Sequence, residues 1–309
     1  MSEDLRPISI QTIPDAIRIM NGSSDGTSLE YHLDFFSFLS LQGYWNFSSA
    51  HSLIRYVDGE AAAIILACTD PDSHEAYILY WGTIPKFRTR KIAQSLFEAC
   101  CQRLFAAGYV MLYGVSVPDR PVRRYRFIQA APEFNLFDME ARSVTVPAAD
   151  PRFEIRNADV AAISRIQLPT GDRLHWSQRP AFLNHAASRM QFFGAFEQDT
   201  LKTYAVVLPG ASNRAELVDL RSSVSDLAAG YELLRHIFIS TYSPPFAATH
   251  VFDESYSHRL LSNVGFAVSR RFCMLTRDLC ATCSAPAQLK TSPQSELAPE
   301  EKSSPRAAS

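Results

Sequence analysis

The order of predicted elements recurs in the two halves of this chain, and this recurrence constrains the fold more than any single motif does. Apolar runs of strand length and stretches of helical spacing between residues 13 and 146 predict the order α, β, β, β, α, β, α, β. The segment 153–276 repeats that order with almost no residue identity. A repeat of about 150 residues predicts two related domains rather than a solenoid of short units.

Composition places the boundaries of these units. Two prolines bracket small residues from Val146 to Pro151 and predict a boundary between domains at 1–147 and 151–279. Residues 284–309 are rich in Ser, Pro, Ala, Glu and Lys and predict a disordered tail, because they cannot offset their ordering entropy by burial. With 309 residues, 47% of them hydrophobic, the chain has enough apolar surface for two cores.

Charge and cysteine content disfavour several classes of protein. Thirty basic and 32 acidic residues give a net charge of −2, which offers no general attraction to nucleic acid or to anionic membranes. No apolar run reaches the roughly 18 residues of a membrane span, and the charged start does not resemble a signal peptide, so a cytoplasmic location is expected. Cys280 and Cys283 have the spacing of half a zinc site but lack a second pair, so no metal is expected.

A basic loop joins a predicted strand to a predicted helix in the first half. The apolar run Ala76–Trp81 precedes the loop. Apolar residues follow it at helical spacing until Gly108, which offers a C-cap: Ile92, Leu96, Cys100 and Leu104. A helix N-terminus presents unpaired N–H groups and partial positive charge, so Arg88, Arg90 and Lys91 reinforce a predicted anion site there.

The basic loop resembles the acyl-CoA signature of the GCN5-related N-acetyltransferase family, R/Q-x-x-G-x-G/A. Residues 88–93 match its first and last positions, and Lys91 stands where the family usually has glycine. Residues 84–87 resemble the family's V-x-P-x-[YF] approach to the loop. In the second half, residues 256–266 resemble the family's terminal helix and Gly-Phe turn, whereas residues 221–226 lack the glycine pattern and contain Asp226.

The resemblance implies a mixed α/β fold with two tandem acyl-CoA N-acyltransferase-like domains, each a mixed, mainly antiparallel sheet flanked by helices. It implies that pantetheine pairs with the exposed edge of the strand before the basic loop. The second domain is expected to be a degenerate copy that does not bind CoA, because an acid in its loop repels pyrophosphate. The expected cofactor-binding residues are Gly82, Thr83, Ile84, Arg88, Thr89, Arg90, Lys91, Ile92 and Ala93.

The chemistry implied by the resemblance is direct transfer of an acetyl or other acyl group from acyl-CoA to an amine in a ternary complex. Tyr125 is the expected acid, with a core or rim tyrosine as its alternative, and Glu75 is the expected base, with a surface strand-end glutamate as its alternative. The expected acceptor is a small-molecule or peptide amine. The alternative function is a catalytically silent binding or regulatory module, which Lys91, Asp119 and the missing Gly-Phe after Tyr125 favour.

Overall fold

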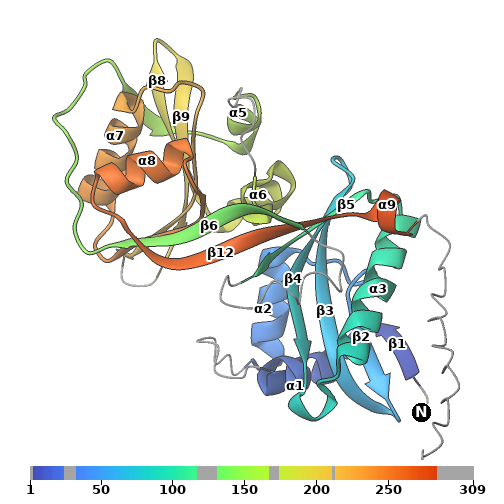
Figure 1. The fold of residues 1–309 in the computed structure, drawn as a ribbon. Coiled ribbons are helices and arrows are strands. Elements are labelled where there is room, and N and C mark those ends of the chain that lie inside the picture. Colours follow the sequence, from blue (N-terminus) through green and yellow to red (C-terminus); the bar gives the residue numbers. More distant parts are fainter. Residues whose placement is uncertain (1–2, 24–32, 117–130, 167–173, 211–212, 284–309) are drawn as a thin grey trace, which may run out of the picture.

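The structure, a computed structural model, describes residues 3–23, 33–116, 131–166, 174–210 and 213–283. The first half contains β1 (Glu3–Pro7), α1 (Ile13–Ser23), α2 (Phe35–Trp45), β2 (Leu53–Val57), β3 (Glu60–Asp70), β4 (Glu75–Thr83), η1 (Pro85–Phe87), α3 (Arg90–Ala106), β5 (Met111–Ser116) and β6 (Ala131–Ala141). From α1 to β5 this order follows the predicted one, except that α2 was not predicted; β1 was not predicted either. Figure 1 shows the elements in sequence colours.

The second half repeats much of this arrangement. It contains β7 (Glu154–Asn157), α5 (Val160–Ser164), η2 (Trp176–Gln178), α6 (Pro180–Ala186), η3 (Ala187–Arg189), β8 (Gln191–Glu197), β9 (Thr200–Pro209), β10 (Ala215–Ser222), α7 (Ala228–Arg235), the π-helix η5 (His236–Thr241), β11 (Phe246–Phe252), α8 (Tyr256–Asn263), β12 (Ala267–Asp278) and α9 (Leu279–Cys283). The mixed α/β fold with mainly antiparallel strands is therefore confirmed.

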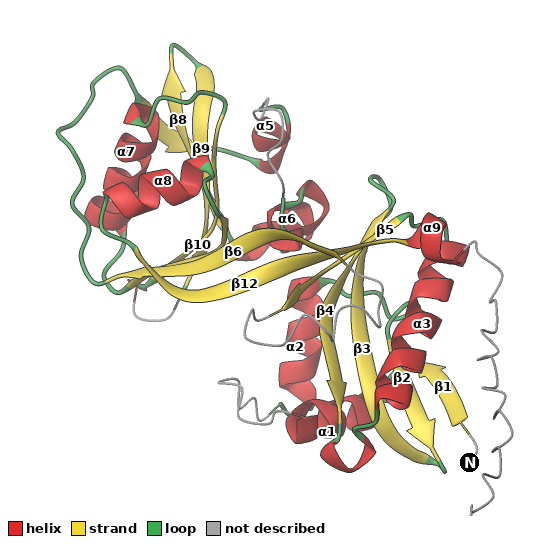
Figure 2. Cartoon of the chain, viewed as in Figure 1, coloured by secondary structure: helices red, strands yellow, loops and turns green. Residues whose placement is uncertain are grey.

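All the described strands form one sheet of 12 strands, in the order β1-β2-β3-β4-β5-β12-β6-β11-β10-β9-β8-β7. The halves exchange strands at its centre: β12 pairs with β5 of the first half, and β6 pairs with β11 of the second. The two exchanged strands also pair with each other and run as a long ribbon between the halves (Figure 2). Only β4–β5 and β10–β11 are parallel pairs.

Local sequence explains the elements that lead to the basic loop. Asp58 and Gly59 have φ values of 50° and 83°, as a tight hairpin turn between β2 and β3 requires. Helix α3 begins at the N-cap Thr89, whose hydroxyl accepts a hydrogen bond from the N–H of Ile92 at 3.3 Å. It ends before Gly108, which has a φ of 92°. In the sequence, Asp-Gly between the apolar runs 53–57 and 61–69 predicts this hairpin, and the apolar spacing after the basic loop predicts this helix; both are confirmed.

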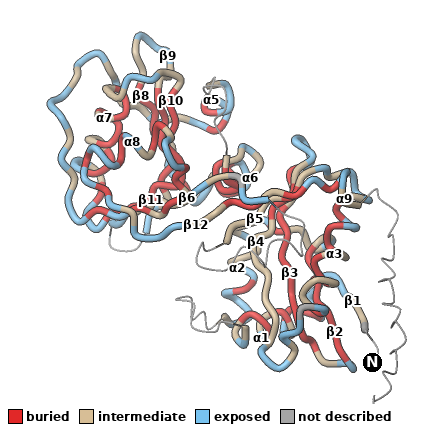
Figure 3. Tube along the Cα trace, viewed as in Figure 1, coloured by how far each residue is buried: buried red, intermediate tan, exposed pale blue. Residues whose placement is uncertain are grey.

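The core has layers on both faces of the sheet, and residues of both halves contribute to them. Helix α3 packs Leu96 and Leu104 against one face of the first half, and α1 and α2 cover the other face. The cluster under α1 and α2 continues without a break into Trp176 and Phe182 of the second half. Figure 3 shows this buried material, including α6, between the halves.

The strand predicted at residues 143–146 is wrong. The backbone there is irregular and makes one hydrogen bond, from the N–H of Thr145 to the carbonyl of Val264 at 3.0 Å. The last strand of the first half is instead β6, whose partners come from the second half, and no local pattern reveals such pairing. The predicted helix at 122–130 and the predicted tail at 284–309 lie outside the described residues.

Candidate functional site

Strand β4 separates from its neighbour β5 halfway along its length. The parallel pairing of β4 with β5 runs from Glu75–Met111 to Ile78–Gly114 and ends there. The pairing of β4 with β3 continues to Thr83, while β5 turns to β12. Among the described strands, none pairs with residues 79–83 on the β5 side. This edge of β4 is therefore open.

A β-bulge marks the point of separation. The register between β3 and β4 shifts from Ala67–Ile78 to Leu66–Tyr80, so Leu79 is the extra residue. A bulge bends its strand and increases the local twist, and bulges recur beside active sites. The bulge at Leu79 accounts for the divergence of β4 from β5.

The backbone groups of the predicted residues alternate between the two edges of β4. Ile84 donates its N–H to the carbonyl of Ala62 at 3.0 Å, so its backbone faces β3. Because adjacent residues of a strand face opposite edges, the backbone of Gly82 also faces β3, whereas that of Thr83 faces the open edge. The Thr83 carbonyl accepts a hydrogen bond from Arg88 Nε at 3.2 Å, which agrees with this orientation.

The basic loop brings the open edge directly to the start of α3. Arg88 also donates from Nη2 to the carbonyl of Ser23 at 2.8 Å and so ties the loop to the end of α1. Lys91 is exposed in the first turn of α3, which Arg90 begins, while Ile92 is buried beneath and Ala93 is half-buried. An exposed cation beside the N–H groups of a helix start favours a bound anion.

Glu75, the predicted base, lies at the other end of β4. Its Oε1 accepts a hydrogen bond from the Tyr113 hydroxyl at 2.9 Å, and its Oε2 forms an ion pair with Arg179 of the second half. Arg179 also lies 3.9 Å from Asp70 Oδ2. Sequence patterns did not reveal the role of Arg179, because this residue meets Glu75 across 104 positions of the chain. Tyr125, the predicted acid, and Asp119 lie outside the described residues.

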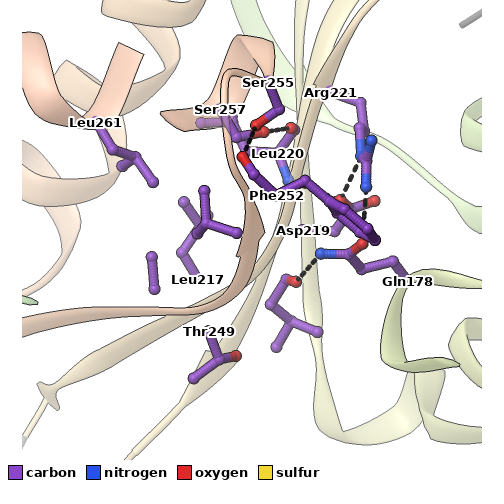
Figure 4. A pocket seen from close by; sticks show the side chains of 13 residues that line it. Gln178, Leu217, Asp219, Leu220, Arg221, Thr249, Phe252, Ser255, Ser257 and Leu261 are labelled. Atoms are coloured by element: carbon purple, nitrogen blue, oxygen red, sulfur yellow. Dashed lines mark hydrogen bonds and ion pairs between the residues drawn. The ribbon is translucent and has the colours of Figure 1, made fainter. Parts of the chain in front are cut away.

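The second half has a matching separation of strands, but side chains close it. The β10–β11 pairing ends at Leu217–Ala248, and β10 bulges at Val218 immediately afterwards. The carbonyl of Val218 accepts a hydrogen bond from Gln178 Nε2 at 3.3 Å, and the carbonyl of Leu220 accepts one from the Ser257 hydroxyl. Figure 4 shows these side chains around a cavity with room for about one water molecule.

A buried arginine fills the position that Gly82 holds in the first half. Counted from the two bulges, Arg221 corresponds to Gly82. Arg221 is 3% exposed and pairs with Asp219 at 2.9 Å and with Gln178 at 2.7 Å (Figure 4). Burial raises the pKa of Asp219. The adjacent guanidinium and the Tyr204 hydroxyl partly offset this rise. Arg221 therefore has a structural role and does not form a phosphate loop.

Two kinds of feature are absent from the residues that the structure describes. Within them, no group of three or more His, Cys, Asp and Glu side chains is arranged to hold a metal ion. None of their helices combines the length and the apolar content that crossing a bilayer requires.

Comparison with known proteins identifies relatives of the first half and of the whole fold. Residues 22–125 match the sequence model of the acetyltransferase (GNAT) family. No curated protein sequence matches the chain. Many solved structures resemble it across most of its length.

Three of these structures illustrate the likeness. The chain is 13% identical to a tandem GNAT protein from the clavulanic acid biosynthesis pathway, with 90% of this chain and 99% of that one covered and a TM-score of 0.59. It is also 13% identical to a GCN5-related N-acetyltransferase from Anabaena variabilis, with 90% of this chain and 73% of that one covered and a TM-score of 0.60. It is 11% identical to a GCN5-related N-acetyltransferase from Sphaerobacter thermophilus, with 90% of this chain and 96% of that one covered and a TM-score of 0.59. Residues 22–125 are therefore similar to the acetyltransferase (GNAT) family, and the whole chain has the fold of tandem GNAT proteins.

Proposed function

We propose that the first half binds acetyl-CoA, or another acyl-CoA, and transfers its acyl group to a small-molecule or peptide amine in a ternary complex. The observation that carries the proposal is the open edge of β4, which leads through the basic loop to the N-terminus of α3. A peptide-like ligand can pair with such an edge while its phosphates bind at the helix start. The GNAT-family match over residues 22–125 spans this region.

The second half, residues 151–279, is proposed to support the site without binding CoA. The edge of β10 that corresponds to the open edge of β4 already bonds to Gln178 and Ser257. Arg221, which is buried, occupies the position in β10 that corresponds to Gly82 in β4. We therefore expect titration calorimetry to give a stoichiometry of one CoA per chain; two equivalent sites would contradict this role.

Lys91→Glu tests the phosphate site. The substitution places a carboxylate where the proposal places pyrophosphate, so CoA should bind at least about tenfold more weakly, as expected from the loss of a charge-assisted contact. An acid at a helix N-terminus stabilises the helix, so weaker binding cannot result from unfolding. Calorimetry with CoA provides the measurement.

Arg103→Glu is the matched control for Lys91→Glu. Arg103 is exposed in the last turn of the same helix, so its reversal changes the net charge equally at the far end. The Arg103→Glu variant should bind CoA with the same affinity as the unaltered protein. Equal weakening in both variants would mean that the overall charge, rather than a site at the helix start, governs binding.

Proton transfer is assigned to Glu75 as base and Tyr125 as acid. Glu75 begins β4, and Leu79 lies roughly 13 Å further along the strand, so Glu75 would act through water. Glu75→Gln keeps an acceptor for the Tyr113 hydroxyl but removes the charge. We expect kcat to fall by about 10²-fold or more while CoA affinity stays unchanged, measured by thiol release and calorimetry.

Arg179→Gln separates a basic role of Glu75 from its ion pair. This variant breaks the same pair but leaves the carboxylate in place. A base should tolerate it far better than Glu75→Gln. If the two variants lose kcat equally, the ion pair between the halves matters and Glu75 is not the base.

The silent module remains the second candidate function, because Lys91 replaces the usual glycine of the loop. Thiol release from acetyl-CoA with a panel of amines, together with calorimetry, distinguishes the two. Turnover supports the acyltransferase. Binding of CoA without turnover on any amine supports the module.

A further inference from the structure

His175 joins the second half of the chain to β4 of the first. Its Nε2 lies 2.5 Å from the hydroxyl of Tyr77, and the two rings meet edge to face with centroids 4.9 Å apart. The exposed fractions of His175 and Tyr77 are 2% and 6%. The contact between the halves is therefore sealed from solvent on both sides.

The neighbours of His175 favour a neutral ring. Its Nδ1 accepts a hydrogen bond from the backbone N–H of Ser177 at 3.3 Å, and the Ser177 hydroxyl lies 2.9 Å from the same nitrogen. With Nδ1 as acceptor, Nε2 carries the proton of the ring and donates it to Tyr77. A second proton on Nδ1 would deprive the Ser177 N–H of its acceptor and leave Nδ1 only the Ser177 hydroxyl to donate to.

His250 of β11 lies flat against His175. The two rings are 3.7 Å apart at an angle of 9°, and His250 Nδ1 is buried without a hydrogen-bond partner among the described residues. Burial lowers the pKa of His250 to about 4. Burial, and then the proximity of His250, lower the pKa of His175 well below its ordinary value. Protonating both would bring like charges face to face.

The acids on the elements around His250 do not compensate a positive charge there. Asp138 of β6 accepts a hydrogen bond from the backbone N–H of His250 at 3.2 Å, and burial raises the pKa of this carboxyl. Glu216 of β10 bonds to Thr249, and burial and Asp138 raise its pKa. Both carboxyls therefore move toward their neutral forms as pH falls.

Among the described residues, the remaining elements around the two rings supply no free negative charge either. Gln178 of η2 binds the carbonyl of His250 at 3.4 Å, and the Phe272 ring of β12 lies 6.1 Å from the His250 ring. Arg221, which bonds to Gln178, is already paired with Asp219. Near Tyr77, the thiol of Cys68 from β3 is buried, and its pKa is raised.

We propose that Tyr77, His175 and His250, the junction triad, form a pH-sensitive contact that holds the second half against β4 and opens when the stacked imidazoles gain protons. The direction of this pH dependence follows from the pKa values of the two histidines in the closed and open states. In the open state they regain a pKa near the unperturbed value of about 6.5, so the open state binds more protons. The closed contact is favoured above that pH and is lost as pH falls toward about 4.

Two tryptophans beside the triad report its opening without any substrate. Trp176 is 2% exposed and donates from Nε1 to the carbonyl of Trp45 at 3.4 Å. The third tryptophan, Trp81, stacks on Phe97 on the α3 side of the sheet, so Trp81→Phe removes its emission. The experiment records emission wavelength and acrylamide quenching of the full chain carrying Trp81→Phe from pH 8 to pH 4.

Below about pH 6.5 the emission should move to longer wavelength and quenching should increase, because Trp176 and Trp45 meet water. The double variant His175→Gln/His250→Asn should lose this transition. Gln keeps a group near Nε2 that reaches Tyr77, and Asn tolerates the φ of 53° found at His250. A transition that persists in the double variant with the same midpoint, or no transition in the unaltered triad, would overturn the proposal.

Two further variants make the outcome specific to the triad. His51→Gln is the matched control, since His51 is also partly buried with a lowered pKa but contacts Ser48 and Tyr109 of the first half. It should leave the transition unchanged. Tyr77→Phe weakens the closed contact and should raise the midpoint; an unchanged or lower midpoint contradicts the role of Tyr77. None of these readouts involves CoA or turnover, so they stand apart from the proposed function.

Discussion

Gly82 shows how a single position shapes the open edge of β4. A Cβ at this residue would lie 2.7 Å from both the Ser23 hydroxyl oxygen and the Tyr80 hydroxyl oxygen, which bond to each other. Glycine therefore permits the end of α1 to approach the strand beside the basic loop. The requirement is for space, because Gly82 has no positive φ.

Gly82→Ala should destabilise the protein by about 1–3 kcal/mol, since Tyr80 and Ser23 must move apart to make room for the methyl group. Chemical denaturation measures the change. Gly22→Ala is the control. Gly22 lies in α1, and a Cβ at this residue would meet only the side chain of Ile84, at 4.0 Å. That substitution should stabilise the protein by about 0.5–1 kcal/mol. Similar losses in both variants would contradict the steric argument.

Residue types alone predicted part of the site. The basic residues at the start of α3 and the C-cap Gly108 were visible, because the ends of a helix have local patterns. The ion pair of Glu75 with Arg179 and the contact of Tyr77 with His175 were not, because each joins residues about 100 positions apart. Side-chain pairing at such separations depends on the assembled fold.

At the scale of elements, the short helix α9 completes the core beneath α3. Leu279 is fully buried in the cluster that contains Leu96 and Leu104, although it lies in the last described helix of the second half. Arg277, at the end of β12, adds an ion pair with Glu98 of α3 at 2.8 Å. The C-terminal elements thus belong to the packing of the first half.

Leu279→Ala should cost about 2–5 kcal/mol of unfolding free energy, because it leaves a cavity under α3. The loss should be visible in urea denaturation followed by circular dichroism. Ile239→Ala is the control, since Ile239 is 55% exposed and should change stability little. A negligible effect of Leu279→Ala would show that α9 does not seal this core.

The elements themselves followed from the sequence better than their pairing did. The apolar runs on both sides of Asp58-Gly59 predicted the β2–β3 hairpin, whose strands are adjacent in the chain. The exchange of β6 and β12 was missed, because each copy was expected to keep its own last strand. Strand partners at long separation leave no periodic signal within one sequence.

At the scale of the molecule, the continuous sheet and the shared core couple the halves. The described strands form one ladder from β1 to β7, and one hydrophobic cluster contains residues of both halves. Strands β5 and β11 each pair with a strand of the other half. The two copies of the fold are therefore expected to be a single unit of stability.

Unfolding in urea should consequently follow one transition for all probes. Far-ultraviolet circular dichroism reports the whole chain, and the emission of Trp45 and Trp176 reports the junction; their midpoints should coincide at pH 7.5, where the junction triad is closed. A variant with Leu233→Ala, which opens a cavity only in the second half, should shift both midpoints together. Separate transitions would show that the halves unfold independently.

The pairing of β12 with β5 also delays completion of the sheet during synthesis. Strand β5 ends at Ser116, but its neighbour in the sheet begins at Ala267. A ribosome adding 5–20 residues per second needs roughly 8–30 s to make the intervening stretch of about 150 residues. Throughout that interval the first half lacks the strand that pairs with β5, and β5 presents an unpaired edge to whatever chaperone or nascent chain lies nearby.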